Sequence, residues 1–123
     1  MTNKIMTLAL LTGMAAGALS YWFNPYNTTR AFGIHIYLLM VLSTFVAAFL
    51  LASALSASPT RIALLLCSGV VISVLGRIFF DLSNDPGTHN LFPIEVFVVL
   101  VLATPSAFAG TYLFHLMKRL KAA

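Results

Sequence analysis

Four long apolar stretches set the strongest limit on what this chain can fold into. They cover about 5–23, 33–55, 62–80 and 93–117 of a sequence of 123 residues. Because an α-helix rises about 1.5 Å per residue, about 20 mostly apolar residues cross the roughly 30 Å hydrocarbon core of a bilayer. The sequence therefore predicts an all-α membrane protein, with a single domain of four transmembrane helices over residues 1–123.

The composition excludes several classes of protein. Hydrophobic residues make up 60% of the chain and charged residues only 8%, whereas a soluble domain has about 25% charged residues. We therefore expect the chain to lie in the lipid bilayer. A soluble enzyme and a disordered tail are both excluded. The basic residues stand singly between apolar runs and do not form a patch, so nucleic acid is not an expected partner.

Short polar connections separate the four stretches. Residues 24–32 join the first pair, 56–61 form a tight turn, and 81–92 form the longest and most polar connection. Short links make successive helices antiparallel neighbours. The sequence therefore predicts an antiparallel four-helix bundle.

The basic residues predict how this bundle is oriented. Five of them fall on one side of a four-span arrangement: Lys4, Arg61, Lys118, Arg119 and Lys121. Arg30 and Arg77 fall on the other side. Cytoplasmic loops carry the excess of Lys and Arg, so we expect both termini in the cytoplasm, in the inner membrane of a bacterium.

The first apolar stretch also has an alternative interpretation. Lys4, the apolar run that follows it and Ala16-Gly17-Ala18 are typical of a signal peptide with a small-residue cleavage site. Cleavage there would leave three spans. We favour four.

Small residues recur at helical spacing and are candidates for helix packing. Because lipid is as apolar as leucine, membrane helices associate through close packing of small residues rather than through the hydrophobic effect. The candidate residues are Gly13, Gly17, Gly69, Ser73, Ala103 and Ala107. They can pack within one chain or between the copies of a homo-oligomer, and the sequence leaves both open.

A polar cluster is predicted on the outer side of the bundle. All three acidic residues of the chain lie between the end of the third span and the start of the fourth. The candidate site residues are Arg30, His35, Arg77, Asp81, Asp85, His89, Asn90 and Glu95. If the protein has a site, we expect it there.

Each of these residues also has a structural interpretation. Arg77 and Asp81 are four positions apart, which allows an ion pair on one helix face. Glu95 follows Pro93 in the predicted first turn of a helix, where the helix dipole stabilises an acid. The histidines and carboxylates suit a metal chemically, but no metal-binding spacing supports one, so we predict neither a metal nor a cofactor.

Three functions remain compatible with the sequence. The first is a non-enzymatic accessory subunit that packs against a larger membrane protein. The second is a homo-oligomeric channel or facilitator for ions or small solutes, with the polar cluster as its vestibule. The third is an outward-facing enzyme that acts on a lipid or a lipid-linked substrate.

Overall fold

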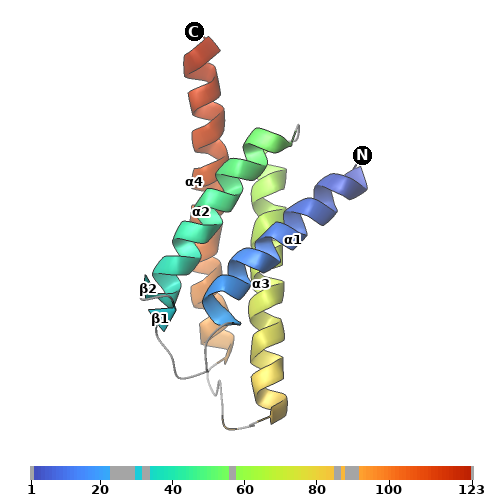
Figure 1. Cartoon of the computed structure of the whole chain (residues 1–123), viewed down its shortest axis with the longest axis vertical. Helices are drawn as coiled ribbons and strands as arrows, with labels where there is room; N and C mark the ends of the chain where they lie inside the picture. Colours follow the sequence, from blue (N-terminus) through green and yellow to red (C-terminus); the bar gives the residue numbers. More distant parts are fainter. Residues whose placement is uncertain are drawn as a thin grey trace.

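The structure, a computed structural model, describes residues 2–22, 30–31, 34–55, 58–84, 87 and 92–122. It consists of four α-helices and one pair of two-residue strands (Figure 1). The elements are α1 (Thr2–Tyr21), β1 (Arg30–Ala31), β2 (Ile34–His35), α2 (Ile36–Ala54), α3 (Pro59–Asn84) and α4 (Phe92–Ala122). The strands pair antiparallel, with Arg30 opposite His35.

Three of the helices are long and apolar enough to cross a membrane. They are α2, α3 and the part of α4 from Pro93 to Ala122. In α1 the apolar helix that the described residues provide, Asn3–Leu19, is shorter. The three long helices support the prediction of an integral membrane protein, and a fourth span through α1 stays a prediction.

Helix α3 begins earlier than the sequence predicted. The predicted turn at 56–61 is wrong for residues 59–61, which are helical. Ser58 caps this end, because its Oγ accepts a hydrogen bond from the Arg61 N–H at 3.2 Å and its carbonyl oxygen accepts one from the Ile62 N–H at 3.1 Å. Pro59 then suits the first helical position, where a missing N–H costs nothing.

The other end of α3 also extends beyond its predicted span. Residues 81–84 are helical and do not belong to the connection before α4. Ser83 Oγ donates to the Phe79 carbonyl at 2.8 Å, and Asn84 Nδ2 donates to the Phe80 carbonyl at 2.9 Å. Both bonds run to the carbonyl oxygen four residues earlier, so these polar side chains find partners within their own helix.

The helices pack through their small residues. Consecutive helices run in opposite directions, with α1 packed mainly on α3 and α2 mainly on α4 (Figure 1). Gly13 and Gly69 lie opposite each other, and a Cβ on either would overlap a backbone carbonyl oxygen of the facing helix. Gly17 lies against Ser73 one turn further along, because a Cβ there would come within 2.9 Å of the Ser73 Cβ. Two matched small residues on each helix therefore form the seam between α1 and α3.

The α2–α4 contact follows the same principle. A Cβ on Gly110 would lie 2.5 Å from the Phe45 carbonyl oxygen and 2.7 Å from the Ala48 Cβ. Ala103 and Ala107, which the sequence proposed for packing, are fully buried. All six residues proposed for packing thus belong to helices that meet within one chain.

The interior is apolar, with a few hydroxyl groups. Ser106 Oγ donates to the Leu102 carbonyl at 2.6 Å, and Thr111 Oγ1 donates to the Ala107 and Phe108 carbonyls at 3.2 and 3.1 Å. Within the described part of the chain, Thr44 Oγ1 is the one buried side-chain oxygen without a hydrogen-bond partner. These hydroxyls of Ser106 and Thr111 thus bond to the backbone of their own helix.

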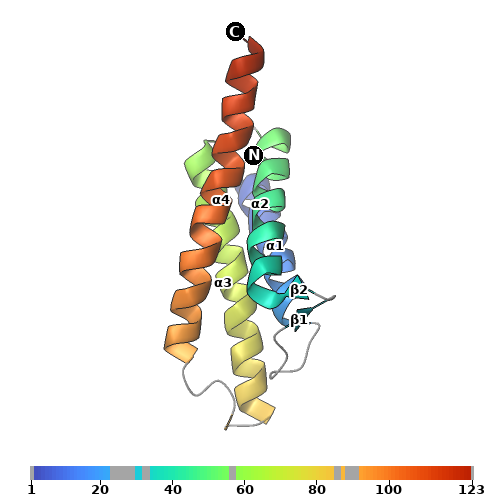
Figure 2. The same ribbon diagram turned by 90° about the vertical axis from the view of Figure 1, so that its left-hand side faces the viewer.

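The two ends of the bundle differ in charge. Both termini and the junction between α2 and α3 lie at one end, and α4 extends beyond the other helices there (Figures 1 and 2). This end carries the five basic residues that the sequence assigned to one side. We call it the basic end, and the opposite end, which holds Arg77, Asp81 and Glu95, the acidic end.

Candidate functional site

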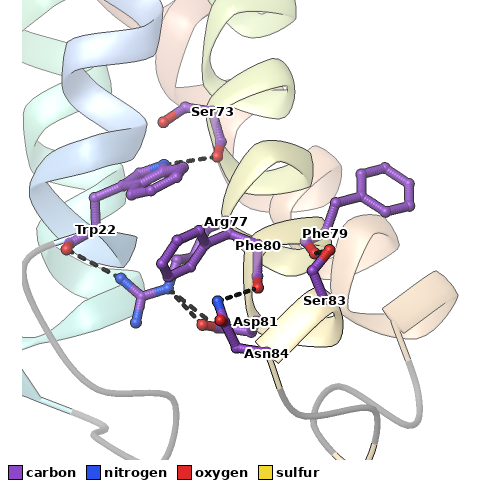
Figure 3. A network of polar contacts seen from close by, with 8 residues as sticks. All are labelled: Trp22, Ser73, Arg77, Phe79, Phe80, Asp81, Ser83 and Asn84. Carbon is purple, nitrogen blue, oxygen red and sulfur yellow. Dashed lines mark hydrogen bonds and ion pairs between the residues drawn. The ribbon is translucent and has the colours of Figure 1, made fainter.

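The centre of the acidic end is an ion pair within α3. Arg77 Nε donates to both carboxylate oxygens of Asp81, at 3.0 and 3.1 Å (Figure 3). The four-residue spacing predicted this pair. The two side chains are only 12% and 10% exposed, so the pair is largely removed from its surroundings.

Trp22, just after the end of α1, joins this pair to a second helix. Arg77 Nη1 donates to the Trp22 carbonyl oxygen at 3.0 Å, and the Trp22 indole Nε1 donates to the Ser73 carbonyl oxygen at 2.9 Å (Figure 3). Trp22 thus accepts from one turn of α3 and donates to the turn before it. We call Trp22, Ser73, Arg77 and Asp81 the Trp22 latch.

Two aromatic rings flank the guanidinium of the latch. The Arg77 Cζ lies 5.7 Å from the centre of the Trp22 ring and 5.9 Å from that of Phe80. The two rings lie 5.7 Å apart, in a tilted arrangement. The distances from Arg77 Cζ to the two rings are within the range of a cation–π interaction, which further stabilises the guanidinium charge.

The latch can hold helices together but has little capacity for chemistry. Asp81 is buried and accepts from Arg77 with both oxygens, so its carboxylate is not presented to a substrate. A carboxylate engaged in this way is poorly suited to act as a general base, which must reach the proton it removes. The arrangement favours a structural role for Arg77 and Asp81.

His35 serves as the cap of α2. Its Nδ1 accepts a hydrogen bond from the Tyr37 N–H at 3.2 Å, and its ring lies 5.6 Å from the Tyr37 ring. The bond satisfies one of the free N–H groups that every helix start leaves. One ring nitrogen of His35 is therefore already used by the backbone.

The other predicted cluster residues are described only in part. Glu95 is half-buried in the first turn of α4, where it suits the helix dipole. Arg30 lies in β1, opposite His35. Asp85, His89 and Asn90 lie outside the described residues. Among the residues that the structure does describe, no group of three or more His, Cys, Asp or Glu side chains could hold a metal ion.

Trp22 was not among the residues predicted to form a site. It ends the first apolar stretch, in Tyr21-Trp22-Phe23, and tryptophan is enriched at the two interfaces of a membrane. That preference predicts the depth of the residue but not its partner, because the Ser73 and Arg77 contacts come from a helix more than fifty positions away.

An open groove lies between α1 and α2. It has a volume of about 630 Å³ and is lined almost entirely by apolar side chains. Its lining combines small residues with exposed leucine and valine side chains: Thr12, Ala15, Ala16, Leu19, Leu39, Leu42, Ser43, Val46, Ala47, Leu50, Leu51 and Ala54. Ser43 Oγ, part-buried, lies 3.2 Å from the Met40 carbonyl oxygen of its own helix and 3.5 Å from the Ala16 carbonyl oxygen of α1, and can donate to either.

Comparison of the chain with protein-family models, with curated proteins and with solved structures finds no match. The arguments for function therefore come from the chain itself.

Proposed function

We propose that this protein is a small polytopic membrane protein that acts as a non-enzymatic interaction subunit of a larger membrane assembly. The observation that carries the proposal is the groove between α1 and α2, which fits a transmembrane helix of the partner. We further propose that α1 crosses the bilayer with the other three helices, as the groove requires.

The positions of the charges support this embedding. Arg61 and Asp81 are twenty positions apart in α3, and Glu95 and His115 are twenty positions apart in α4. At about 1.5 Å per residue, each interval measures about 30 Å, the thickness of the hydrocarbon core. In α1, Lys4 and Trp22 bracket a similar length. The excess of basic residues at the basic end favours a cytoplasmic location for that end, and we propose the bacterial inner membrane.

The side chains of the groove suit a helix better than water or a polar solute. Transmembrane helices associate where small residues let their backbones approach closely. Ala15 and Ala47 have small side chains, and the larger side chains of Leu42 and Leu50 are exposed in the same groove. Leucine and valine side chains of a partner helix would fill the space over the small residues, beside the exposed leucines.

Two features make the alternatives less favourable. A channel formed by one chain needs a polar path, whereas the interior of the described bundle is packed with apolar side chains. An outward-facing enzyme needs an accessible acid or base, whereas Asp81 is engaged by Arg77. A homo-oligomeric channel would place its path between chains, and the experiment below separates that case.

The test is native mass spectrometry of the untagged protein, extracted from its own membrane in mild detergent. We expect the mass of a complex with a different chain. Ala15→Leu should reduce this complex, because Ala15 lines the groove and is exposed in the isolated chain, so the larger side chain can be accommodated without disturbing the fold. Ser68→Leu is the matched control, since Ser68 is exposed on α3 outside the groove.

Two results would contradict the proposal. A homo-oligomer without another chain, followed by solute flux in proteoliposomes of the pure protein, would establish the channel. Equal loss of the complex in Ala15→Leu and Ser68→Leu would show that the groove is not the contact surface.

A further inference from the structure

The expectation that the basic residues form no patch is wrong for the last turns of α4, which form a basic surface that the proposed partner contact does not use. Helix α4 has 31 residues, against 19 in α2 and 26 in α3, and its C-terminal turns extend beyond the rest of the bundle (Figure 2). Lys118, Arg119 and Lys121 are all exposed there. The groove between α1 and α2 includes none of these residues.

Two pockets meet at the base of this extension. The smaller has a volume of about 380 Å³, exposes mainly polar atoms and is lined by Ser53, Ser58, His115 and Lys118 among others. The larger has a volume of about 580 Å³, with an apolar wall that includes Leu113 and Leu116 and with Arg119 in its lining. Because His115 lines both, the polar pocket and the apolar pocket adjoin across one side chain.

The smaller pocket offers hydrogen-bond donors to an anion. Lys118 contributes an ammonium group. The Ser58 Oγ accepts from the Arg61 N–H, so its own hydrogen can be donated to a ligand oxygen. His115 Nδ1 lies 3.0 Å from the Thr111 carbonyl oxygen, which can only accept, so the Nδ1–H is directed at the backbone and is not available to an anion; Lys118 and Ser58 are the donors. No acidic side chain is among the residues that line either pocket.

The depth of the pockets matches the headgroup region of a bilayer. His115 lies about 30 Å along α4 from Glu95 (at 1.5 Å per residue), which places the pockets at the far edge of the hydrocarbon core. Tyr112, whose hydroxyl lies 2.8 Å from Thr60 Oγ1, is exposed in the same region, where membrane proteins concentrate tyrosine. At this depth the larger pocket faces acyl chains and the smaller faces phosphates.

We propose that the basic end binds an anionic phospholipid. Its phosphate occupies the smaller pocket, held by Lys118 and Ser58, and one acyl chain follows Leu113 and Leu116 in the larger pocket, with Arg119 near the headgroup. Basic pockets between helices on the cytoplasmic side of a membrane suit anionic headgroups. The proposal rests on the membrane embedding proposed above but not on the partner helix, so the two can fail separately.

The experiment measures lipid binding to the pure protein by native mass spectrometry, with phosphatidylglycerol or phosphatidylcholine added to the detergent. We expect phosphatidylglycerol to bind more tightly. Lys118→Gln should weaken phosphatidylglycerol binding about tenfold, the size expected for a lost hydrogen bond to a charged group, and Arg119→Gln should also weaken it by more than the control below. Lys121→Gln is the matched control, because Lys121 is on the same exposed helix end and lines neither pocket.

Three results would contradict the proposed lipid site. Equal weakening by Lys121→Gln would show general attraction between opposite charges and would overturn the site. Equal binding of the two lipids would remove the phosphate recognition. Inorganic phosphate at millimolar concentration is added as a competitor. If it displaces the lipid, the ligand is a free oxyanion and the phospholipid proposal is wrong. If it does not, the acyl chain contributes to binding as proposed. Lys118→Arg should retain the binding that Lys118→Gln loses.

Discussion

The two ends of the bundle use charge in opposite ways. At the acidic end, Arg77 and Asp81 are largely buried and bonded to each other, and Arg77 also reaches Trp22. At the basic end, Lys118, Arg119 and Lys121 are exposed on a helix that extends past its neighbours. Charges of the first kind are part of the fold, whereas charges of the second kind remain available to a ligand.

Because of this difference, the charges at the acidic end should affect the stability of the fold, and those at the basic end should affect ligand binding. Removing one partner of a buried pair leaves the other partner without compensation and destabilises the protein. Removing an exposed lysine changes stability little, because it loses no packed contact. Substitutions at the two ends should therefore affect different measurements, and the following predictions test that separation from the largest effect to the smallest.

The largest effect is expected between the two ends, at the seam that holds α1. Gly69→Ala should lower the free energy of unfolding by about 3 kcal/mol, because the added Cβ overlaps the Leu10 carbonyl and presses within 2.9 Å of the Gly13 Cα. The measurement is a titration with denaturing detergent followed by the fluorescence of Trp22, the single tryptophan. If α1 is displaced, Trp22 leaves its latch and its emission shifts.

The same substitution at another glycine of α3 is the control. A Cβ on Gly76 would meet only the Trp22 ring, at an ordinary 3.5 Å. Gly76→Ala should therefore be neutral or slightly stabilising, since alanine favours a helix. Equal destabilisation by the two substitutions would show that the seam is not closely packed.

The second effect tests whether the acidic end is structural. Asp81→Ala should destabilise by about 2 kcal/mol, because the buried guanidinium of Arg77 loses its carboxylate. The double variant Arg77→Met with Asp81→Leu should recover most of this loss, since it removes both charges. Unfolding titrations of the three proteins provide the comparison, and unchanged stability in Asp81→Ala would return Asp81 to the candidates for chemistry.

The third effect concerns the hydrogen bond of the indole. Trp22→Phe keeps an aromatic ring beside Phe80 and Arg77 but removes the donor to the Ser73 carbonyl oxygen. We expect a loss of about 1 kcal/mol, the usual net contribution of one hydrogen bond. Thermal unfolding followed by circular dichroism measures it without the tryptophan signal, and a loss as large as in Asp81→Ala would mean that ring packing dominates the latch.

Local sequence patterns predicted the helices and the ion pair. Long apolar runs correspond to α2, α3 and α4, and the spacing of Arg77 and Asp81 corresponds to their bond, because both depend on residues within one helix. The boundaries of α3 were less predictable. Ser58 and Pro59 are a helix start that the polar composition obscured, and residues 81–84 are helical although their polar side chains suggested a connection.

Contacts between helices could not be predicted from the same patterns. The small-residue spacing identified Gly13, Gly17, Gly69 and Ser73 as packing residues, but not that the two glycines of α1 would lie against the two small residues of α3. Trp22 and the groove between α1 and α2 depend on the angle at which helices cross. That angle is decided by the whole set of side chains at each contact.

The smallest effect on stability should come from the basic end. Lys118→Gln should change the free energy of unfolding by less than about 0.5 kcal/mol, as expected for an exposed side chain, while it weakens binding of phosphatidylglycerol.

Raising the salt concentration should also weaken phosphatidylglycerol binding to the unsubstituted protein, because exposed charges are screened within about 10 Å at 0.1 M salt. The Arg77–Asp81 pair is largely buried, so the stability it provides should respond much less. Parallel salt titrations of unfolding and of lipid binding therefore measure the two ends in one protein. Equal sensitivity to salt in the two titrations would mean that the charges at both ends are equally exposed, which would contradict the burial of the Arg77–Asp81 pair.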